Sequence, residues 1–183
     1  MHQLRFFIFL ASFFSIVQLL AQNPVFPVKE QEIHWEEIVA VPQAHTNELN
    51  ERWNKFVSKP PAGVKFSKKG KDATGANIAI VRIVVQPSAE KISQVEAELK
   101  CRVYAIQGKY SYEIHSPILF KENIRYSAYL LYQGVQKGKP YVKTTLEKES
   151  VALARHEELL RMFDQKMKSF LSEMKKTMGE VQE

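Results

Sequence analysis

Residues that could carry out chemistry are few in this chain and widely spaced. Four histidines follow the N-terminal segment and lie on separate predicted elements: His34, His45, His115 and His156. His156 precedes two glutamates, but no second histidine follows at the step that a zinc-protease helix needs. Asp72 and Asp164 are the only aspartates, and no glycine-rich loop follows a predicted strand. We therefore expect no metal site, no nucleotide cofactor and no catalytic residues.

The thiol and hydroxyl nucleophiles leave one alternative open. Cys101 is the only cysteine, so the chain has no intramolecular disulfide, and it falls between two apolar positions of a predicted strand. A cysteine in such a place acts as a small hydrophobic residue, and no neighbour in the sequence would lower the pKa of its thiol. A Ser–His–Glu triad built from distant parts of the chain is the alternative by which the protein would be a hydrolase-like enzyme.

A recognition surface is better supported, because one segment places suitable side chains together. From Val95 to Ile114 apolar and polar residues alternate, which is typical of a β-hairpin with one dry and one wet face. A two-residue turn at Gln107-Gly108 sets Ala105 against Tyr110 and keeps the two faces distinct. The same register places Cys101 opposite Ile114 and Val103 opposite Tyr112 on the dry face.

The wet face of this hairpin carries the candidate site. An aromatic ring, a cation, a carboxylate and an imidazole lie there together: Arg102, Tyr104, Glu113 and His115. Arg102 is expected to face Glu113, as a cross-strand pair of opposite charge. If no helix covers this side, the residues form a recognition surface, and if another segment covers it they are part of the core.

The remaining elements follow from punctuation and periodicity. Strands are predicted at Ile33–Val41, Val64–Ser67 and Asn77–Val85, with a lysine-rich loop between the last two and a connection at Ser88–Ile92. A helix with Thr46 as its N-cap precedes Pro60-Pro61. Between Ser116 and Thr145 the pattern is weaker: Pro117 is expected to break the hairpin's second strand, and a short helix is expected to end at Gly134.

The C-terminal part predicts a long amphipathic helix. Lysines lie on the opposite side of this helix from one stripe of apolar residues. The stripe has steps of three and four: Leu160, Phe163, Met167, Phe170, Met174 and Met178. Thr144 and Glu147 have the spacing of a capping box before it. We expect the stripe to cover the dry face of the hairpin. The alternative is a helix that lies on a membrane surface.

Composition and the N-terminus indicate an exported domain. The chain is 45% hydrophobic and 25% charged, as expected for one globular domain of this length. Arg5, the apolar run of residues 6–20 and the small residue Ala21 form the pattern of a signal peptide, with no cysteine at the cleavage point for lipid attachment. The net charge of +6 falls by one on cleavage, which is too modest to predict nucleic-acid binding.

Two segments resemble a family of exported bacterial domains of unknown function that is described as having a TATA-binding-protein-like fold. Residues 37–42 (EIVAVP) with 46–53 (TNELNERW) are similar to that family's strand–proline–helix opening, and residues 163–171 (FDQKMKSFL) to its closing helix. These motifs concern packing and capping. The resemblance therefore implies a fold, and it implies no activity, functional residue or DNA binding.

Together these observations predict an α+β fold. An antiparallel sheet of about five strands carries a short N-terminal helix and a long C-terminal helix on one face, TBP-like, with a helix-grip arrangement as the alternative. We expect a signal peptide at 1–21, an extended lead-in at 22–31 and a single domain at 32–180. The expected function is a non-enzymatic module of the periplasm or cell envelope that binds a protein or small ligand, with no nucleic acid and no favoured membrane contact.

We predict that export removes residues 1–21, because an apolar run this short is below the ~20 residues of a spanning helix. The intact mass of the protein from the envelope fraction measures this directly. A mass beginning at Gln22 is expected, and a mass that includes the leader would indicate a retained anchor.

Overall fold

The computed structural model describes residues 24–86, 94–121 and 124–179. The predicted signal peptide and the predicted connection at Ser88–Ile92 lie outside these ranges. Seven strands and three helices are described in chain order: β1 (Val28–Lys29), β2 (Glu32–Ala40), α2 (Thr46–Ser58), β3 (Val64–Lys71), β4 (Asn77–Gln86), β5 (Val95–Ile106), β6 (Lys109–Lys121), β7 (Ile124–Ser127), α3 (Ala128–Gln136) and α4 (Glu149–Gly179).

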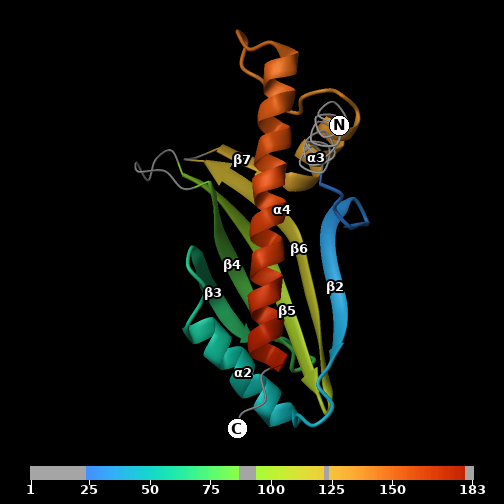
Figure 1. Ribbon diagram of the computed structural model, residues 1–183, viewed down its shortest axis with the longest axis vertical. Helices are drawn as coiled ribbons and strands as arrows, with labels where there is room; N and C mark the ends of the chain where they lie inside the picture. The colour runs from blue at the N-terminus through green and yellow to red at the C-terminus, as the bar shows by residue number, and fades with distance from the viewer. Residues whose placement is uncertain (1–23, 87–93, 122–123, 180–183) are drawn as a thin grey trace, which may run out of the picture.

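The strands form one antiparallel sheet in the order β1-β2-β6-β5-β4-β3, with β7 paired to the far end of β6. Helix α4 runs the length of one face of this sheet (Figure 1), and α2 packs against α4 and β5. We call this the inner face. The α+β class and the two helices on one face are confirmed. The sheet has two strands more than the expected five, β1 and β7, which are too short to give a clear pattern in the sequence.

The predicted hairpin register is confirmed. In the β5–β6 pair Ala105 faces Tyr110, Cys101 faces Ile114 and Arg102 faces Glu113. The odd-numbered residues of β5 are all buried on the inner face, which is the dry face that the alternation predicted. The tight turn works although Gln107 precedes Gly108, because Gly108 supplies the positive φ of 75°.

Segment 116–145 corrects one prediction and refines another. Pro117 does not end the strand: β6 continues to Lys121 through a β-bulge, in which Ser116 has a φ of 55° and Pro117 needs no ladder hydrogen bond. The expected short helix exists as α3, but residues 124–127 before it form β7 and the helix runs past Gly134 to Gln136.

Two local predictions at element ends were wrong, and a third pair, Thr144 and Glu147, forms the expected bond but ahead of the helix. The lysine-rich run is not the loop but strand β3 itself, and the turn lies at residues 72–76. The N-cap of α2 is His45 rather than Thr46, and its backbone N–H donates to Glu48 at 3.4 Å. Glu147 caps a separate turn, accepting from the N–H of Thr144 at 3.2 Å, before α4 begins at Glu149.

The apolar stripe of α4 forms the centre of the core. All six of its predicted members are buried, from Leu160 to Met178. Phe163 packs against Phe26 and Trp35 at ring-centroid distances of 5.8 and 5.9 Å. Two helical turns further on, the ring centroid of Phe170 lies 5.8 Å from that of Phe56 on α2. In the described part of the chain no helix has the length and apolarity needed to cross a membrane.

Residues 24–29 also take part in the packing, within the segment predicted as an extended lead-in. Phe26 is buried beside Phe163, and Val28–Lys29 form β1 against Glu32 and Ile33. Glu30 and Gln31 make the turn between β1 and β2 with positive φ angles.

We predict that Phe163→Ala and Phe170→Ala each lower the free energy of unfolding by about 3–5 kcal/mol, as buried aromatic truncations do. Thermal and denaturant melts measure the loss. Leu146→Ala is the control, since Leu146 is fully solvent-facing and its truncation should change little. Parent-like melts of both phenylalanine variants would mean that α4 is not docked on the sheet.

Candidate functional site

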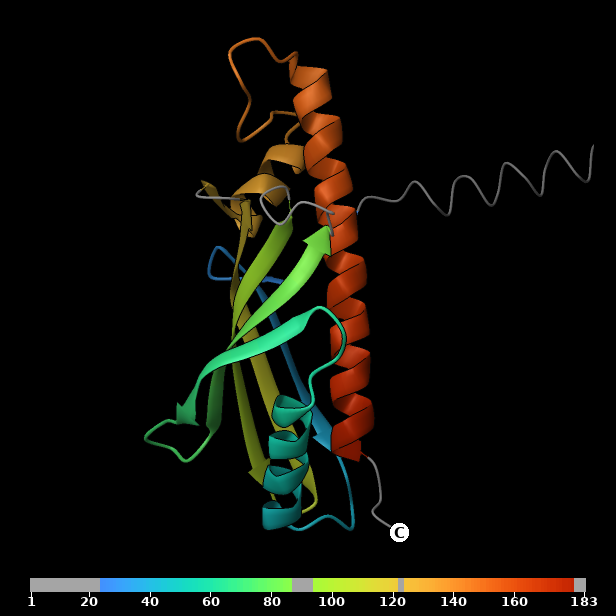
Figure 2. The same cartoon turned by 90° about the vertical axis from the view of Figure 1, so that its left-hand side faces the viewer.

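The sheet face opposite α4, which we call the outer face, is not covered by any helix of the described chain (Figure 2). All four predicted site residues lie on it: Arg102 and Tyr104 on β5, and Glu113 and His115 on β6. Their side chains are partly exposed, and Tyr104 is 40% accessible. The structure therefore brings these residues together on the uncovered side of the sheet.

Arg102 is held more firmly than its place on an open face suggested. Its Nη1 is 3.4 Å from the Glu113 carboxylate, as the register predicted. Its Nε also donates to Asp72 at 2.7 Å and its Nη2 to the Thr74 hydroxyl at 2.9 Å. Arg102 thus ties the β3–β4 turn to the outer face, and its guanidinium is fixed in one position.

Asp72 organises the turn that Arg102 holds. It accepts from the backbone N–H groups of Thr74 and Ala76 at 2.8 and 3.1 Å, and from the Thr74 hydroxyl at 2.6 Å. Thr74, then Arg102 and these N–H groups, lower the pKa of Asp72 to about 2. The carboxylate consequently stays ionised at neutral and mildly acidic pH.

Strand β2 adds histidine and glutamate side chains that the sequence alone did not place here. His34 lies directly across from His115, with the rings stacked at a centroid distance of 5.7 Å, and Glu36 lies across from Glu113. Lys29 donates to Glu36 at 2.8 Å, and this ion pair lowers the pKa of Glu36. The outer face thus carries alternating cations and carboxylates beside an imidazole pair.

The bulge in β6 shapes the end of this surface. Ser116, with its left-handed backbone, donates to Glu32 at 2.6 Å, and its oxygen lies 2.9 Å from Nδ1 of His115. This hydrogen bond from Ser116 is the main reason why the pKa of Glu32 is lowered. A shallow pocket of about 390 Å³ opens beside them, lined by Lys29, Glu30, Glu32, His34, Glu113 and His115. Backbone strain of this kind is often found at functional sites.

Ser116, His115 and Glu32 are the three residue types of a hydrolase triad, but they do not have its geometry. In a triad the serine and the carboxylate contact different ring nitrogens of the histidine. Here Ser116 and Glu32 both approach Nδ1 of His115, at 2.9 and 3.5 Å, and the serine directs its proton to the carboxylate. The arrangement orients His115 and does not activate Ser116.

Other reactive groups are not assembled into a site. Cys101 is buried in the core, and burial raises the pKa of its thiol to about 12, so it is not a nucleophile. His156 is buried on α4, far along the chain from the other histidines, and burial lowers its pKa. Among the described residues no three histidine, cysteine or acidic side chains converge as metal ligands.

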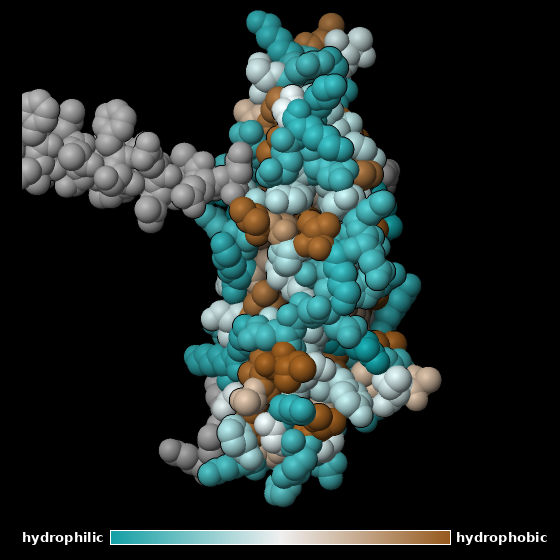
Figure 3. Space-filling model, turned by 90° about the vertical axis from the view of Figure 1, so that its right-hand side faces the viewer, coloured by the Kyte–Doolittle hydropathy of each residue, from teal (hydrophilic) through white to brown (hydrophobic). Residues whose placement is uncertain are grey.

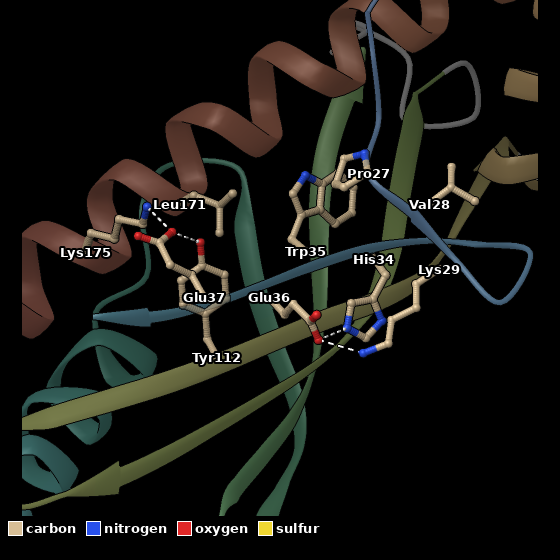
Figure 4. A pocket seen from close by; sticks show the side chains of 10 residues that line it. All are labelled: Pro27, Val28, Lys29, His34, Trp35, Glu36, Glu37, Tyr112, Leu171 and Lys175. Atoms are coloured by element: carbon tan, nitrogen blue, oxygen red, sulfur yellow. Dashed lines mark hydrogen bonds and ion pairs between the residues drawn. The ribbon is translucent and has the colours of Figure 1, made fainter. Parts of the chain in front are cut away.

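A groove of about 530 Å³ runs along the free side of β2 (Figure 4). Glu37 points to the inner side, where it accepts from Tyr112 at 2.8 Å and from Lys175 of α4. Glu36 points to the outer side, toward His34 and Lys29. The strand edge between these two ion pairs forms the floor of the groove.

Comparison with known structures decides the fold. A TBP-like protein from Parabacteroides distasonis superposes with a TM-score of 0.55 over 85% of this chain and 98% of its own, at 11% identity. This chain has a TBP-like fold. A DUF4468 family protein from Bacteroides ovatus is also similar, with a TM-score of 0.52 over 85% of this chain and 91% of its own, at 12% identity.

At these identities the likeness concerns the fold alone and assigns no activity, ligand or site residue to the TBP-like chain. No family model and no curated protein matches the sequence. The TBP-like fold that the two sequence motifs implied is confirmed, and a functional site has to be argued from the geometry of the outer face.

We predict that the β3–β4 turn opens only in strong acid. Because the pKa of Asp72 is depressed from 3.8 to about 2, its contribution to stability is complete above about pH 4 and is lost as the pH falls toward 2. The amide NMR shifts of Thr74 and Ala76 measure this. In the parent protein these shifts should be constant down to about pH 4 and then change as Asp72 is protonated. In an Asp72→Asn variant they should not change. A titration midpoint near pH 3.8 in the parent would contradict the bonding described.

Proposed function

We propose that this TBP-like protein is an exported, non-enzymatic module of the cell envelope that binds a partner through its outer face. Export is inferred from the arrangement of Arg5, the apolar residues 6–20 and Ala21. The binding role rests on one observation: a sheet face that no described helix covers presents Tyr104 beside an arginine that is already fixed in place.

Tyr104 has the properties of a binding anchor. It is 40% exposed, it lies across from Ser111, and its hydroxyl has no hydrogen bond to the described part of the chain. Tyrosine supplies a large contact area at a low cost in conformational entropy, and its hydroxyl can satisfy a partner's polar group. Since Tyr104 is not part of the core, the fold does not account for its size.

The neighbours of Tyr104 are pre-organised. Arg102 is held by Asp72, Thr74 and Glu113, so little rotamer freedom is lost when a partner docks against its exposed edge. On β6, His115 is held in a similar way through Ser116. A surface whose polar side chains are already oriented loses little conformational entropy when a partner binds.

The charges indicate what kind of partner this face fits. Lys29 and Glu36 form one pair, and Arg102 is shared between Asp72 and Glu113. Because each of these cations is already matched by a carboxylate, the surface favours a protein of mixed charge over a polyanion such as nucleic acid. Shallow relief around the 390 Å³ pocket likewise suits a protein surface.

We predict that a photo-crosslinking amino acid at position 104 captures a discrete partner in cells that export the protein. The control places the same group at Tyr141, which is 48% exposed but lies in the loop before α4. An adduct formed from position 104 and not from position 141 is expected. Adducts that are the same from both positions, or none from position 104, would contradict the proposal.

Tyr104→Ala keeps this test interpretable. The variant should unfold within about 0.5 kcal/mol of the parent, because a half-exposed side chain outside the core carries little packing energy. A much lower melting temperature would show that Tyr104 is covered and belongs to the core instead.

A further inference from the structure

The two edges of the sheet are protected very differently. Strand β3 forms one edge, and it carries a β-bulge between Ser67 and Gly70, a left-handed residue at Lys68 and several lysines. These are the devices by which proteins keep an edge strand from pairing with another chain. Strand β2 lies near the other edge, and between Glu36 and Ala40 it has no bulge, no left-handed residue and no lysine.

Within the described residues, most of β2 has no neighbouring strand along the edge that points away from β6. β1 pairs only with Glu32 and Ile33, and one further bond runs from the N–H of His34 to the carbonyl of Pro27. Because backbone groups alternate in direction along an antiparallel strand, Glu36, Ile38 and Ala40 point their N–H and C=O groups to the same side as His34. No backbone partner for these groups is described in residues 24–86, 94–121 and 124–179.

Side chains leave room for a strand along this edge. The 530 Å³ groove borders the first part of this edge, at Glu36 and Glu37, and the flanking ion pairs turn Glu36 to one face and Glu37 to the other, away from the edge (Figure 4). Ile38, between them and the end of β2, is 69% exposed. Figure 3 faces this side of the molecule, where hydrophobic patches interrupt a mostly hydrophilic surface.

We infer that this edge pairs with β2 of a second copy of the chain, antiparallel, about a two-fold axis at Ile38. Glu36, Ile38 and Ala40 then bond to Ala40, Ile38 and Glu36 of the second copy. The two Ile38 side chains face each other on the outer face, each Glu36 faces an Ala40, and each Glu37 faces a Val39. Such an interface is self-complementary, as a two-fold dimer requires.

Other two-fold registers would also place the edge-directed N–H and C=O groups of the two strands opposite each other, but they are energetically less favourable. Moving the axis to Glu37 or to Glu36 sets two like charges directly opposite each other, which is destabilising. Moving it to Val39 pairs Glu36 with Pro42, which has no N–H to donate. The Ile38 register alone uses all three edge-directed residues without a like-charge pair, which is the self-complementarity that pairing with a second copy requires.

This pairing is independent of the binding proposed for Tyr104. A two-fold axis perpendicular to the sheet joins the two sheets into one and leaves both outer faces exposed on the same side. The dimer would therefore present two copies of the proposed binding surface to one partner or one layer of the envelope.

The mass of the exported protein in solution, from light scattering after size-exclusion chromatography, tests the inference. The parent should have twice the mass of one chain, Ile38→Lys should fall to one, and Tyr104→Ala should remain at two. Ile124→Lys is the matched control, because Ile124 is 55% exposed on β7 and should not affect dimerisation. A monomeric parent, or an Ile38→Lys variant that stays dimeric, would overturn the inference.

A cross-link tests the register itself. Directly opposed residues of a hydrogen-bonded antiparallel pair have Cα atoms about 5.5 Å apart, which is within the range of a disulfide. Oxidation of Ile38→Cys should thus give a covalent dimer, and oxidation of Ile124→Cys should not. Cys101 is buried and does not compete. Ile38→Cys that remains monomeric on oxidation would exclude this register.

Discussion

The packing of one helix stripe on one sheet face is the interaction on which the rest of the structure depends. The side chains of α4 from Leu160 to Met178 are buried along the inner face, where Phe163 meets Trp35 and Phe26 and Phe170 meets Phe56. Each such side chain contributes about 1.5–3 kcal/mol on burial. Without this cover, the apolar residues of β5 and β6 would face water, and a hairpin alone is marginally stable at best.

Because α4 and α2 both lie on that one face, the opposite face is left to other uses. It carries more structure than a solvated surface needs: Arg102 is fixed by Asp72, Thr74 and Glu113, and Ser116 holds a strained backbone while bonding Glu32. The one-sided cover likewise leaves the edge at Ile38 open to pairing. A fold stabilised from one side thus keeps the proposed binding face and the proposed pairing edge apart, so the two would not compete.

Local patterns were sufficient to predict the elements that follow a clean period. The alternation from Val95 to Ile106 fixed the hairpin register, and the spacing from Leu160 to Met178 fixed the buried side of α4, since both periods are readable within one segment. The site was only half predictable. His34 faces His115 because β2 pairs with β6, and Asp72 reaches Arg102 from thirty residues away. Strand order and the placement of a turn depend on tertiary structure, so a pattern within one segment does not predict them. Pro117 was misjudged because a proline permits a bulge as well as a break.

The central claim is that one sheet face is sealed by α4 and the other is open, and hydroxyl-radical footprinting of the purified protein measures both faces in one experiment. Methionine is intrinsically very reactive, so its protection is informative. Met167, Met174 and Met178 should resist oxidation, while Tyr104 should react about as readily as the exposed Tyr141. Rapid oxidation of the three methionines, or protection of Tyr104 to the level of the buried Tyr110, would contradict the account.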